Sequence, residues 1–273
     1  MAPYPQIDPV IFSLGPLQVR WYGLMYILGF AAVYLLVSRQ IRKYRLKFLG
    51  DHFEDLNFVL IIGLILGARL GYVIFYNTGY YLANPGEILA IWQGGMSFHG
   101  ALLGLVTAAW LFCRKKGIPF LKAADLYAVT VPIGLGLGRI GNFINGELYG
   151  RVSEVPWSMI FPAGGPVPRH PSQLYEFLLE GVLLFIILWS MKSVHYRRGW
   201  PAGTLFAAFL IGYGLLRSFA ELFREPDIQL GFLIGPLTMG QTLSSLMVLA
   251  GFAIIIVSRQ KKLLGEERDL PTE

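Results

Sequence analysis

The chain is poor in cysteine, and its first residues are poor in positive charge. Cys113 is the single cysteine in 273 residues, so no internal disulfide can form. It follows a long apolar run and precedes Arg114, Lys115 and Lys116, and we interpret it as a thiol at a helix end rather than as a nucleophile. No Lys or Arg precedes Arg20, so the basic start of a cleaved signal peptide is missing and we expect no such peptide.

Charged residues are also scarce, which excludes an ordinary soluble domain. They make up 15% of the chain, whereas 55% is hydrophobic, and the mean hydropathy is +0.54. The formal net charge of +6 does not indicate a nucleic-acid-binding face, because the basic residues form short clusters between apolar runs. That pattern is typical of membrane topology.

Seven apolar segments are long enough to be membrane-spanning helices. A span needs roughly 20 apolar residues, and a helix is expected because lipid offers no hydrogen-bond partner to the edge of an open sheet. The segments cover residues 19–37, 56–76, 96–112, 120–138, 174–191, 202–222 and 237–257. The sequence therefore predicts an all-α integral membrane protein with seven transmembrane helices, built as a single polytopic domain over residues 1–273.

The distribution of Lys and Arg predicts the orientation. Basic clusters follow the first, third, fifth and seventh segments, at residues 39–47, 114–122, 192–198 and 259–268. Cytoplasmic loops carry such an excess. We therefore expect a periplasmic N-terminus, a cytoplasmic C-terminus and a short periplasmic segment, 139–172, between the fourth and fifth spans.

The remaining basic residues are all arginine and lie toward the outer side, where the positive-inside rule disfavours them. They are Arg20, Arg69, Arg139, Arg151, Arg169, Arg217 and Arg224. The rigid fork of arginine suits carboxylates and phosphates better than an ammonium group does. Arg69 and Arg217 fall inside predicted spans, and Glu221 lies four residues after Arg217, at the spacing of a local helix pair. For these two, a structural pairing and a functional role both stay open.

The stretch GLGRIGNFINGELYGR, residues 136–151, closes the fourth apolar segment with an unusual mixture of glycine and polar side chains. It contains G-x-G-x-x-G, but no strand precedes it and no βαβ unit surrounds it, so we reject dinucleotide binding. A polar loop capping a helix is the bland interpretation. Because Arg224 ends the sixth segment on the same side, Arg139 and Arg224 are expected to converge on one anion, and the abundant anion at that depth is a phospholipid headgroup. Backbone N–H groups near Gly141 and Gly150 are candidate further donors.

Other residues carry weaker signals. His99 follows a Gly-Gly turn on the same side as the outer arginines and is a candidate base, although a lone histidine is more often structural. Tyr22 is either an interfacial aromatic residue or a headgroup contact. Ser172 is a candidate N-cap, and Glu176 and Glu180 are expected to face the bundle interior. Glycines at every fourth position, 63, 67 and 71 with 100 and 104, predict close helix packing.

Several blocks of the sequence together resemble one protein family. GRIGNFINGELYGR is similar to the signature of the prolipoprotein diacylglyceryl transferases of bacterial inner membranes. DPVIFSLGPLQVRWYGLMY, GGMSFHGALLG, PRHPSQLYE and ELFREPD resemble further blocks of that family, in order, from about residue 8 to residue 227. The resemblance implies a multi-pass protein of the inner (plasma) membrane with its active site toward the periplasm.

The resemblance also implies a reaction. Members of the family transfer the diacylglyceryl group of phosphatidylglycerol to the thiol of the lipidation cysteine in a prolipoprotein signal peptide, which forms a thioether and releases glycerol phosphate. The positions that carry over as catalytic are His99, Arg139 and Arg224. Those that carry over as phosphatidylglycerol-binding are Tyr22, Arg139, Asn142, Glu147, Gly150 and Arg224. The expected partners are phosphatidylglycerol, such signal peptides and membrane lipids.

The chemistry of the residues agrees with that reaction. The nucleophile belongs to the substrate, so the chain needs no catalytic cysteine or serine, and a base such as His99 raises the thiolate fraction. Arginines stabilise charge on the leaving phosphate, Glu147 orients an arginine or the glycerol hydroxyls, and no cofactor, metal or nucleic acid is expected. A transporter or flippase of an anionic lipid is the main alternative, and a non-catalytic scaffold is a third. Neither requires the release of glycerol phosphate.

Overall fold

The computed structural model describes residues 2–15, 17–225, 232–234 and 237–264. Its regular structure is mainly helical, with short strand pairs near both ends of the chain. Two compact units can be distinguished. One combines Met1–Arg39 with Ala124–Glu273, and the other is Gln40–Ala123.

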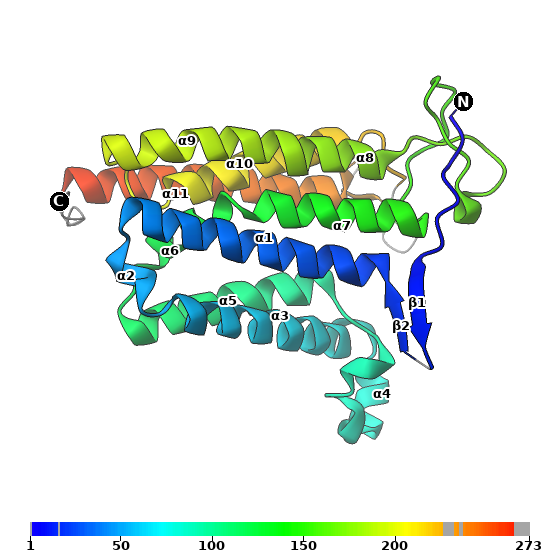
Figure 1. The fold of residues 1–273 in the computed structure, drawn as a ribbon, viewed down its shortest axis with the longest axis horizontal. Coiled ribbons are helices and arrows are strands. Elements are labelled where there is room, and N and C mark those ends of the chain that lie inside the picture. Colours follow the sequence, from blue (N-terminus) through cyan, green and yellow to red (C-terminus); the bar gives the residue numbers. More distant parts are fainter. Residues whose placement is uncertain (1, 16, 226–231, 235–236, 265–273) are drawn as a thin grey trace. The chain divides into compact units, whose positions relative to one another are not determined.

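The first unit begins with an antiparallel hairpin of β1 (Val10–Leu14) and β2 (Leu17–Arg20), which leads into helix α1 (Trp21–Tyr44) (Figure 1). The end of α1 beyond Arg39 belongs to the second unit. The first span was predicted to start at about residue 19, and the helix begins two residues later because Val19 and Arg20 pair in β2 with Phe12 and Val10. The missed signal is a run of β-branched and apolar residues on either side of a Gly-Pro turn.

The fourth predicted segment is a broken helix. Helices α6 (Phe120–Ala128) and α7 (Val131–Asn145) are bent by 46° at their break. Pro132 lies in the first turn of α7, where its missing N–H costs no helical hydrogen bond. Helix α7 continues past residue 138 and ends at Gly146, which has a φ of 68°. Arg139 therefore lies inside a helix, not at its end as predicted.

A long continuous helix follows, made of α8 (Ser172–Glu176), the π-helical turn η4 (Phe177–Leu183) and α9 (Leu184–Arg198). The prediction of Ser172 as N-cap was wrong, because the cap position is Pro171 and the Ser172 hydroxyl donates to the Leu148 carbonyl at 3.0 Å. The sequence contained no local signal for the π-turn.

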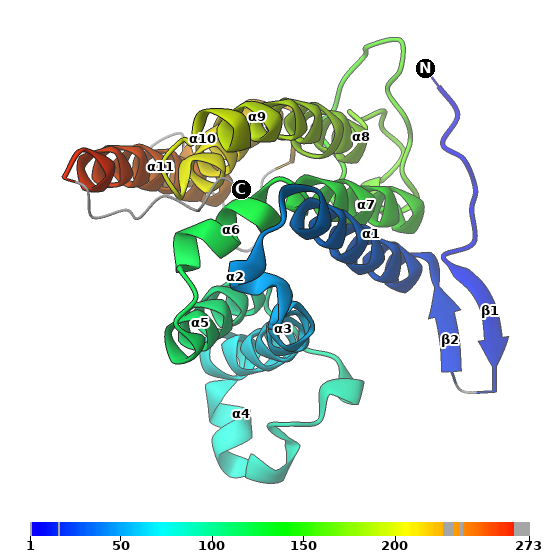
Figure 2. The same cartoon turned by 60° about the vertical axis from the view of Figure 1, so that its left-hand side comes forward.

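Helices α10 (Thr204–Ala220) and α11 (Met239–Leu263) pack against each other, separated in sequence by the short strands β3 (Phe232–Ile234) and β4 (Leu237–Thr238) (Figure 2). Asp125 accepts hydrogen bonds from the N–H groups of Gly203 and Phe206 at 2.7 Å each, so it caps the start of α10 from α6. The apolar core of the unit is formed by Val129, Leu184, Leu188 and Leu205.

The second unit pairs α3 (Phe53–Tyr76) with α5 (Phe98–Lys116). It also holds α2 (Lys47–Gly50), α4 (Thr78–Ala83) and the short turns η1 (Pro85–Glu87) and η2 (Ile91–Gln93). The predicted close packing of glycines is confirmed, because a Cβ on Gly71 would lie 2.6 Å from the Gly100 Cα, and the backbones of Gly67 and Gly104 approach as closely. The helices can touch only where side chains are absent.

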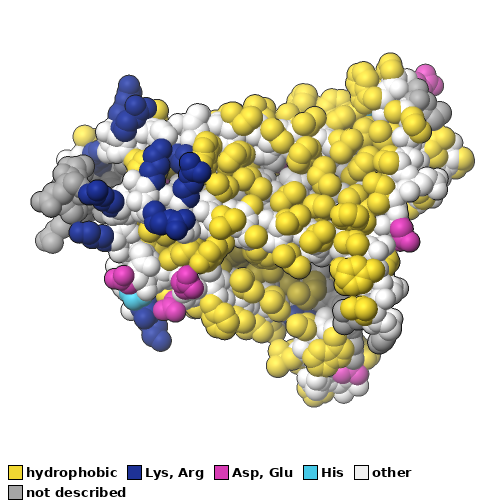
Figure 3. Space-filling view, viewed as in Figure 1, with side chains coloured by type: hydrophobic (Ala, Val, Ile, Leu, Met, Phe, Trp, Pro, Cys, Tyr) yellow, Lys and Arg dark blue, Asp and Glu magenta, His cyan; other side chains and the backbone are white. Residues whose placement is uncertain are grey.

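Among the residues that the structure describes, four helices are long and apolar enough to cross a membrane, and the bent α6–α7 pair makes a fifth if it forms one span. The four are Trp21–Tyr44, Phe53–Tyr76, Ser172–Arg198 and Met239–Leu263. The chain is therefore a multi-pass membrane protein. Apolar side chains cover much of the surface drawn in Figure 3, and within the first unit basic side chains gather where α9 and α11 end.

Candidate active site

A buried cluster of arginines and glutamates forms the polar centre of the first unit. Glu176, which is 1% exposed, bridges arginines from separate segments. Its Oε2 lies 2.6 Å from Arg139 Nε, and its Oε1 lies 2.7 Å from Arg217 Nη1 and 3.5 Å from Arg224 Nη1. Glu180, one turn further, lies 3.7 Å from Arg139 Nη2 and 3.5 Å from Arg217 Nη1. Arg139 and Arg224 therefore converge as predicted, and in this structure they meet at a carboxylate.

A third carboxylate completes the charge balance. Arg217 Nη2 lies 2.6 Å from Glu221 Oε2, which confirms the predicted pair four residues apart. The Thr238 hydroxyl, at the start of α11, donates to Glu221 Oε1 at 3.0 Å. Three guanidinium groups thus face three carboxyl groups, and removing any one charge leaves a buried partner unbalanced.

The π-helical turn η4, which carries Glu180, packs against α7, as does α8, which carries Glu176. At Gly181, inside η4, a Cβ would lie 2.8 Å from the Gly136 Cα, so the two backbones touch there. Gly136 lies one turn before Arg139 on α7. A π-turn inside an α-helix changes the direction of the side chains that follow, and such turns are frequent at functional sites. This contact brings Arg139 within reach of both Glu176 and Glu180.

The predicted headgroup residues Tyr22, Asn142 and Glu147 form a second polar group in the same unit. Glu147 Oε1 accepts hydrogen bonds from Asn142 Nδ2 at 2.9 Å and from Asn145 Nδ2 at 3.1 Å. Glu147 thus orients two amides, and its predicted role in orienting an arginine or the glycerol hydroxyls stays a prediction. Tyr22 lies beside Asn142 and packs on Gly141, where a Cβ would be 2.8 Å from Tyr22 Cδ2.

Gly150 joins the segment after α7 to the segment after α10. It bridges Arg224 in antiparallel fashion, and its N–H donates to the His170 carbonyl at 2.8 Å. A Cβ there would lie 2.5 Å from the Phe223 carbonyl and 2.6 Å from His170 Cβ, so only glycine fits. Backbone N–H groups near Gly141 and Gly150 were predicted to be further anion donors, and that role stays a prediction. The Gly150 amide is used by His170, and Gly141 lies inside α7, where amides bond to the preceding turn.

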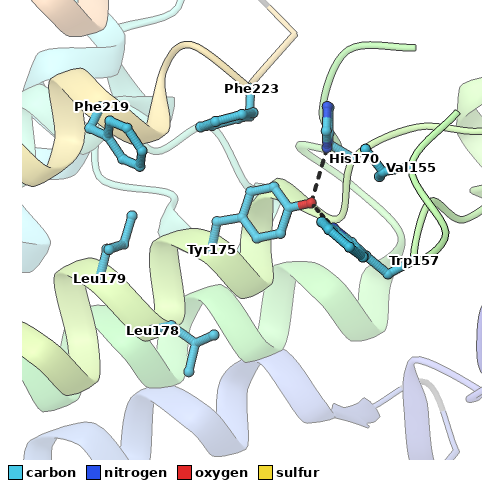
Figure 4. A pocket seen from close by; sticks show the side chains of 8 residues that line it. All are labelled: Val155, Trp157, His170, Tyr175, Leu178, Leu179, Phe219 and Phe223. Carbon is cyan, nitrogen blue, oxygen red and sulfur yellow. Dashed lines mark hydrogen bonds between the residues drawn. The ribbon is translucent and has the colours of Figure 1, made fainter. Parts of the chain in front are cut away.

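An apolar pocket of about 360 Å³ is lined in part by Tyr175 and Phe223, the sequence neighbours of Glu176 and Arg224 (Figure 4). The Tyr175 hydroxyl at its rim accepts from Trp157 Nε1 at 2.6 Å and lies 3.0 Å from His170 Nδ1. Burial lowers the pKa of the His170 imidazole, so the neutral ring is favoured as the acceptor of the Tyr175 O–H. The pocket is lined by Val155, Trp157, His170, Tyr175, Leu178, Leu179, Phe219 and Phe223.

His99 belongs to the second unit and lies in the first turn of α5, with its side chain exposed. The N-cap of this helix is Ser97, whose hydroxyl accepts a hydrogen bond from the Gly100 N–H at 3.2 Å. The placement of His99 close to the start of this helix agrees with the prediction. The proposed role of His99 as a base beside Arg139 stays a prediction.

Comparison with known proteins decides the family. The family model described as prolipoprotein diacylglyceryl transferase matches residues 9–257. The chain belongs to the prolipoprotein diacylglyceryl transferase family. It is similar to proteins named phosphatidylglycerol–prolipoprotein diacylglyceryl transferase from several bacteria. That of Desulfotalea psychrophila is 58% identical and that of Geobacter sulfurreducens 56%, over 92% and 94% of this chain and 93% and 98% of theirs. That of Pseudomonas aeruginosa is 52% identical over 94% of this chain and 95% of its own.

Reasoning from the sequence missed how this transferase-family chain neutralises its outer arginines. Glu176 and Glu180 do face the interior, as predicted, but the sequence did not pair them with Arg139 and Arg224. The available signal was a pair of carboxylates one turn apart inside an apolar segment, since buried carboxylates require partners. Arg69, for which a carboxylate partner was considered, instead donates to backbone carbonyls.

Proposed function

We propose that this chain transfers the diacylglyceryl group of phosphatidylglycerol to the thiol of the lipidation cysteine of bacterial prolipoproteins. Membership of the transferase family supports the activity. The observation that carries the site is the convergence of Arg139, from α7, and Arg224, from the segment after α10, on one buried carboxylate. Guanidinium groups that meet at a carboxylate are also suited to a phosphodiester, which offers oxygens in a similar fork.

The reaction makes one carbon–sulfur bond and breaks one carbon–oxygen bond. The thiolate sulfur attacks the glycerol carbon that carries the phosphate, and the electron pair of the broken bond leaves on the phosphate oxygen. The thiol proton goes to a base, for which His99 is our candidate, and glycerol phosphate is released. Arg139 and Arg224 hold the diester and stabilise the charge that gathers on the leaving oxygens.

The remaining site residues support headgroup binding. Asn142 provides an amide that Glu147 orients, and Tyr22 lies beside it, so these three form a polar surface for the glycerol part of the headgroup. Gly150 pairs with Arg224 in an antiparallel bridge, which holds this part of the headgroup site beside the arginine. The reaction requires no cofactor and no metal, because the arginines provide the positive charge.

We propose a single polytopic domain of seven transmembrane helices in the bacterial inner membrane. Helix α10 has 17 residues and α5 has 19, which correspond to about 25 and 28 Å, close to the thickness of the hydrocarbon core. Basic residues in the last turns of α1, α5, α9 and α11 support a cytoplasmic C-terminus and a periplasmic N-terminus. The active site then faces the periplasm, beside the segment that follows α7.

The partners are phosphatidylglycerol, the signal peptides of prolipoproteins that carry a lipidation cysteine, and the surrounding membrane lipids. Nucleic acid has no role in this reaction. A transporter or flippase of an anionic lipid would use the same arginines but would move the lipid intact. The release of glycerol phosphate therefore separates the transferase from that alternative.

The test uses the purified full-length chain, phosphatidylglycerol and a signal-peptide fragment that contains the lipidation cysteine. Mass spectrometry should detect a diacylglyceryl gain on the peptide, together with an equal amount of free glycerol phosphate. Arg139→Ala should weaken lipid binding and turnover, whereas Arg20→Ala, whose exposed side chain bonds to Gln18 at 2.8 Å, is the control. His99→Gln should lower turnover by about 10²–10⁴-fold, the usual contribution of a general base. Intact lipid without product would refute the transferase, and full activity of His99→Gln would refute the base.

A further inference from the structure

Arg69 has an environment that the proposed chemistry does not use. It lies inside α3, is 1% exposed, and directs its guanidinium group at backbone carbonyls of the turns between α4 and α5. Its Nε donates to Ile88 O at 2.7 Å, and its Nη2 donates to Glu87 O at 2.8 Å. Its Nη1 donates to Gly94 O at 2.5 Å and to Gly95 O at 3.2 Å. One side chain thus ties together both ends of the 87–95 loop.

These carbonyls are suitable partners for a buried cation. They lie at the ends of the short turns η1 and η2, where the last carbonyl groups have no helical partner, although the Glu87 carbonyl also accepts from the Ala90 N–H at 3.0 Å. The Tyr81 ring lies 5.1 Å from the guanidinium carbon and adds a cation–π contact. A lysine could not replace this arrangement, because an ammonium group lacks the planar fork that reaches several acceptors at once.

The loop that Arg69 holds leads directly to His99. Gly94 and Gly95 have φ values of 82° and 74°, and a Cβ on Gly95 would lie 2.5 Å from the Tyr72 ring. Two residues later the Ser97 N–H donates to Ala68 O at 2.9 Å, next to Arg69 on α3. Hydrogen bonds to α3 therefore hold the chain at Gly95 and again at Ser97, just before the first turn of α5.

We propose that Arg69 is a positioning residue for the transfer reaction, which fixes the start of α5 and thereby the imidazole of His99. This inference rests on the proposed role of His99 as the base. It assigns Arg69 no contact with either substrate. Displacement of a catalytic group by about 1 Å can cost about 100-fold in rate. Loss of the fork should therefore reduce turnover while the lipid-binding arginines of the other unit are unaffected.

The experiment is a double-mutant cycle on the full-length chain with Arg69→Lys and His99→Gln. Arg69→Lys should lower kcat about 100-fold. The KM for phosphatidylglycerol should stay unchanged within about twofold, because Arg69 makes no contact with the bound lipid. The double variant should be no slower than His99→Gln alone. Arg114→Lys is the matched control, since Arg114 lies at the opposite end of α5 and stacks on Trp110 at 5.4 Å.

A second pair of variants tests the same loop without changing Arg69. Gly95→Ala should lower kcat and spare KM, whereas Gly86→Ala, where a Cβ meets nothing within 4 Å, should leave both unchanged. The inference is overturned if Arg69→Lys and Gly95→Ala keep the wild-type kcat, or if the Arg69 and His99 effects multiply in the double variant. Either result with an active wild type leaves the transferase intact. Absence of product from the wild type would instead refute the proposed function itself.

Discussion

Glu176→Gln tests whether the buried arginine–glutamate cluster holds the first unit together. The substitution keeps the size of the side chain and removes one negative charge that lies within 2.6 to 3.5 Å of three guanidinium groups. Removing one partner of a buried ion pair usually costs about 3–5 kcal/mol. Here Arg217 keeps Glu221 at 2.6 Å, and Arg139 keeps Glu180 at 3.7 Å. We therefore expect the lower end of that range, about 3 kcal/mol.

The assay is reversible unfolding of the purified chain in mixed micelles by titration with a denaturing detergent, followed by circular dichroism. Glu225→Gln is the matched control, because Glu225 is 44% exposed and pairs with Arg169 at 3.1 Å. An exposed ion pair contributes less than about 1 kcal/mol. If both variants lose the same free energy of unfolding, the cluster does not stabilise the unit and the reasoning is refuted.

Three further predictions concern the surroundings of this cluster. Gly181→Ala should lower the free energy of unfolding by about 1–3 kcal/mol, because the new Cβ would lie 2.8 Å from the Gly136 Cα. Gly138→Ala is the control and should not be destabilising in the same assay, because a Cβ there meets nothing within 4 Å. Tyr175→Phe should cost about 1 kcal/mol in that assay by leaving Trp157 Nε1 without its acceptor, and an unchanged value would exclude a stabilising role for the bond. Burial lowers the pKa of His170 below 6.5, so the unfolded chain takes up its proton first and stability should fall as the pH drops below about 6.5. His170→Asn should remove part of that pH dependence, and an identical pH profile would contradict the assignment.

Periodicity and length were sufficient to predict the helices, because lipid leaves few alternatives to a helix. The predicted apolar segments all contain helices, and the glycine spacing in α3 and α5 correctly predicted a close backbone approach. The errors concern the ends of helices, where strand pairing or packing against other segments decides which residues are helical. The residues before Trp21 form a hairpin strand, and α7 runs on to Asn145 because its glycines are accommodated by packing against Tyr22 and Gly181.

The candidate site was predictable as a set of residue types but not as a set of contacts. A surplus of outer arginines indicated anionic partners, and the pair Arg217–Glu221 followed from helical spacing. The meeting of Arg139 and Arg224 at Glu176 depends on contacts between separate segments, among them the Gly136–Gly181 contact. Such contacts leave no periodic signal, so no pattern within one segment could have predicted them.

Glu176 also competes with the proposed ligand, and this leads to a prediction of opposite sign for binding. A phosphodiester held by Arg139 and Arg224 must share these guanidinium groups with a carboxylate that already lies 2.6 Å from Arg139 Nε. Two like charges about 4 Å apart near a protein surface repel by roughly 4 kcal/mol. Even a third of that repulsion, about 1.4 kcal/mol, corresponds to a tenfold change in affinity. Glu176→Gln should therefore bind phosphatidylglycerol about tenfold more tightly in nanodiscs while it is less stable and turns over more slowly. Weaker binding by this variant would mean that Glu176 acts mainly by holding the two arginines in place.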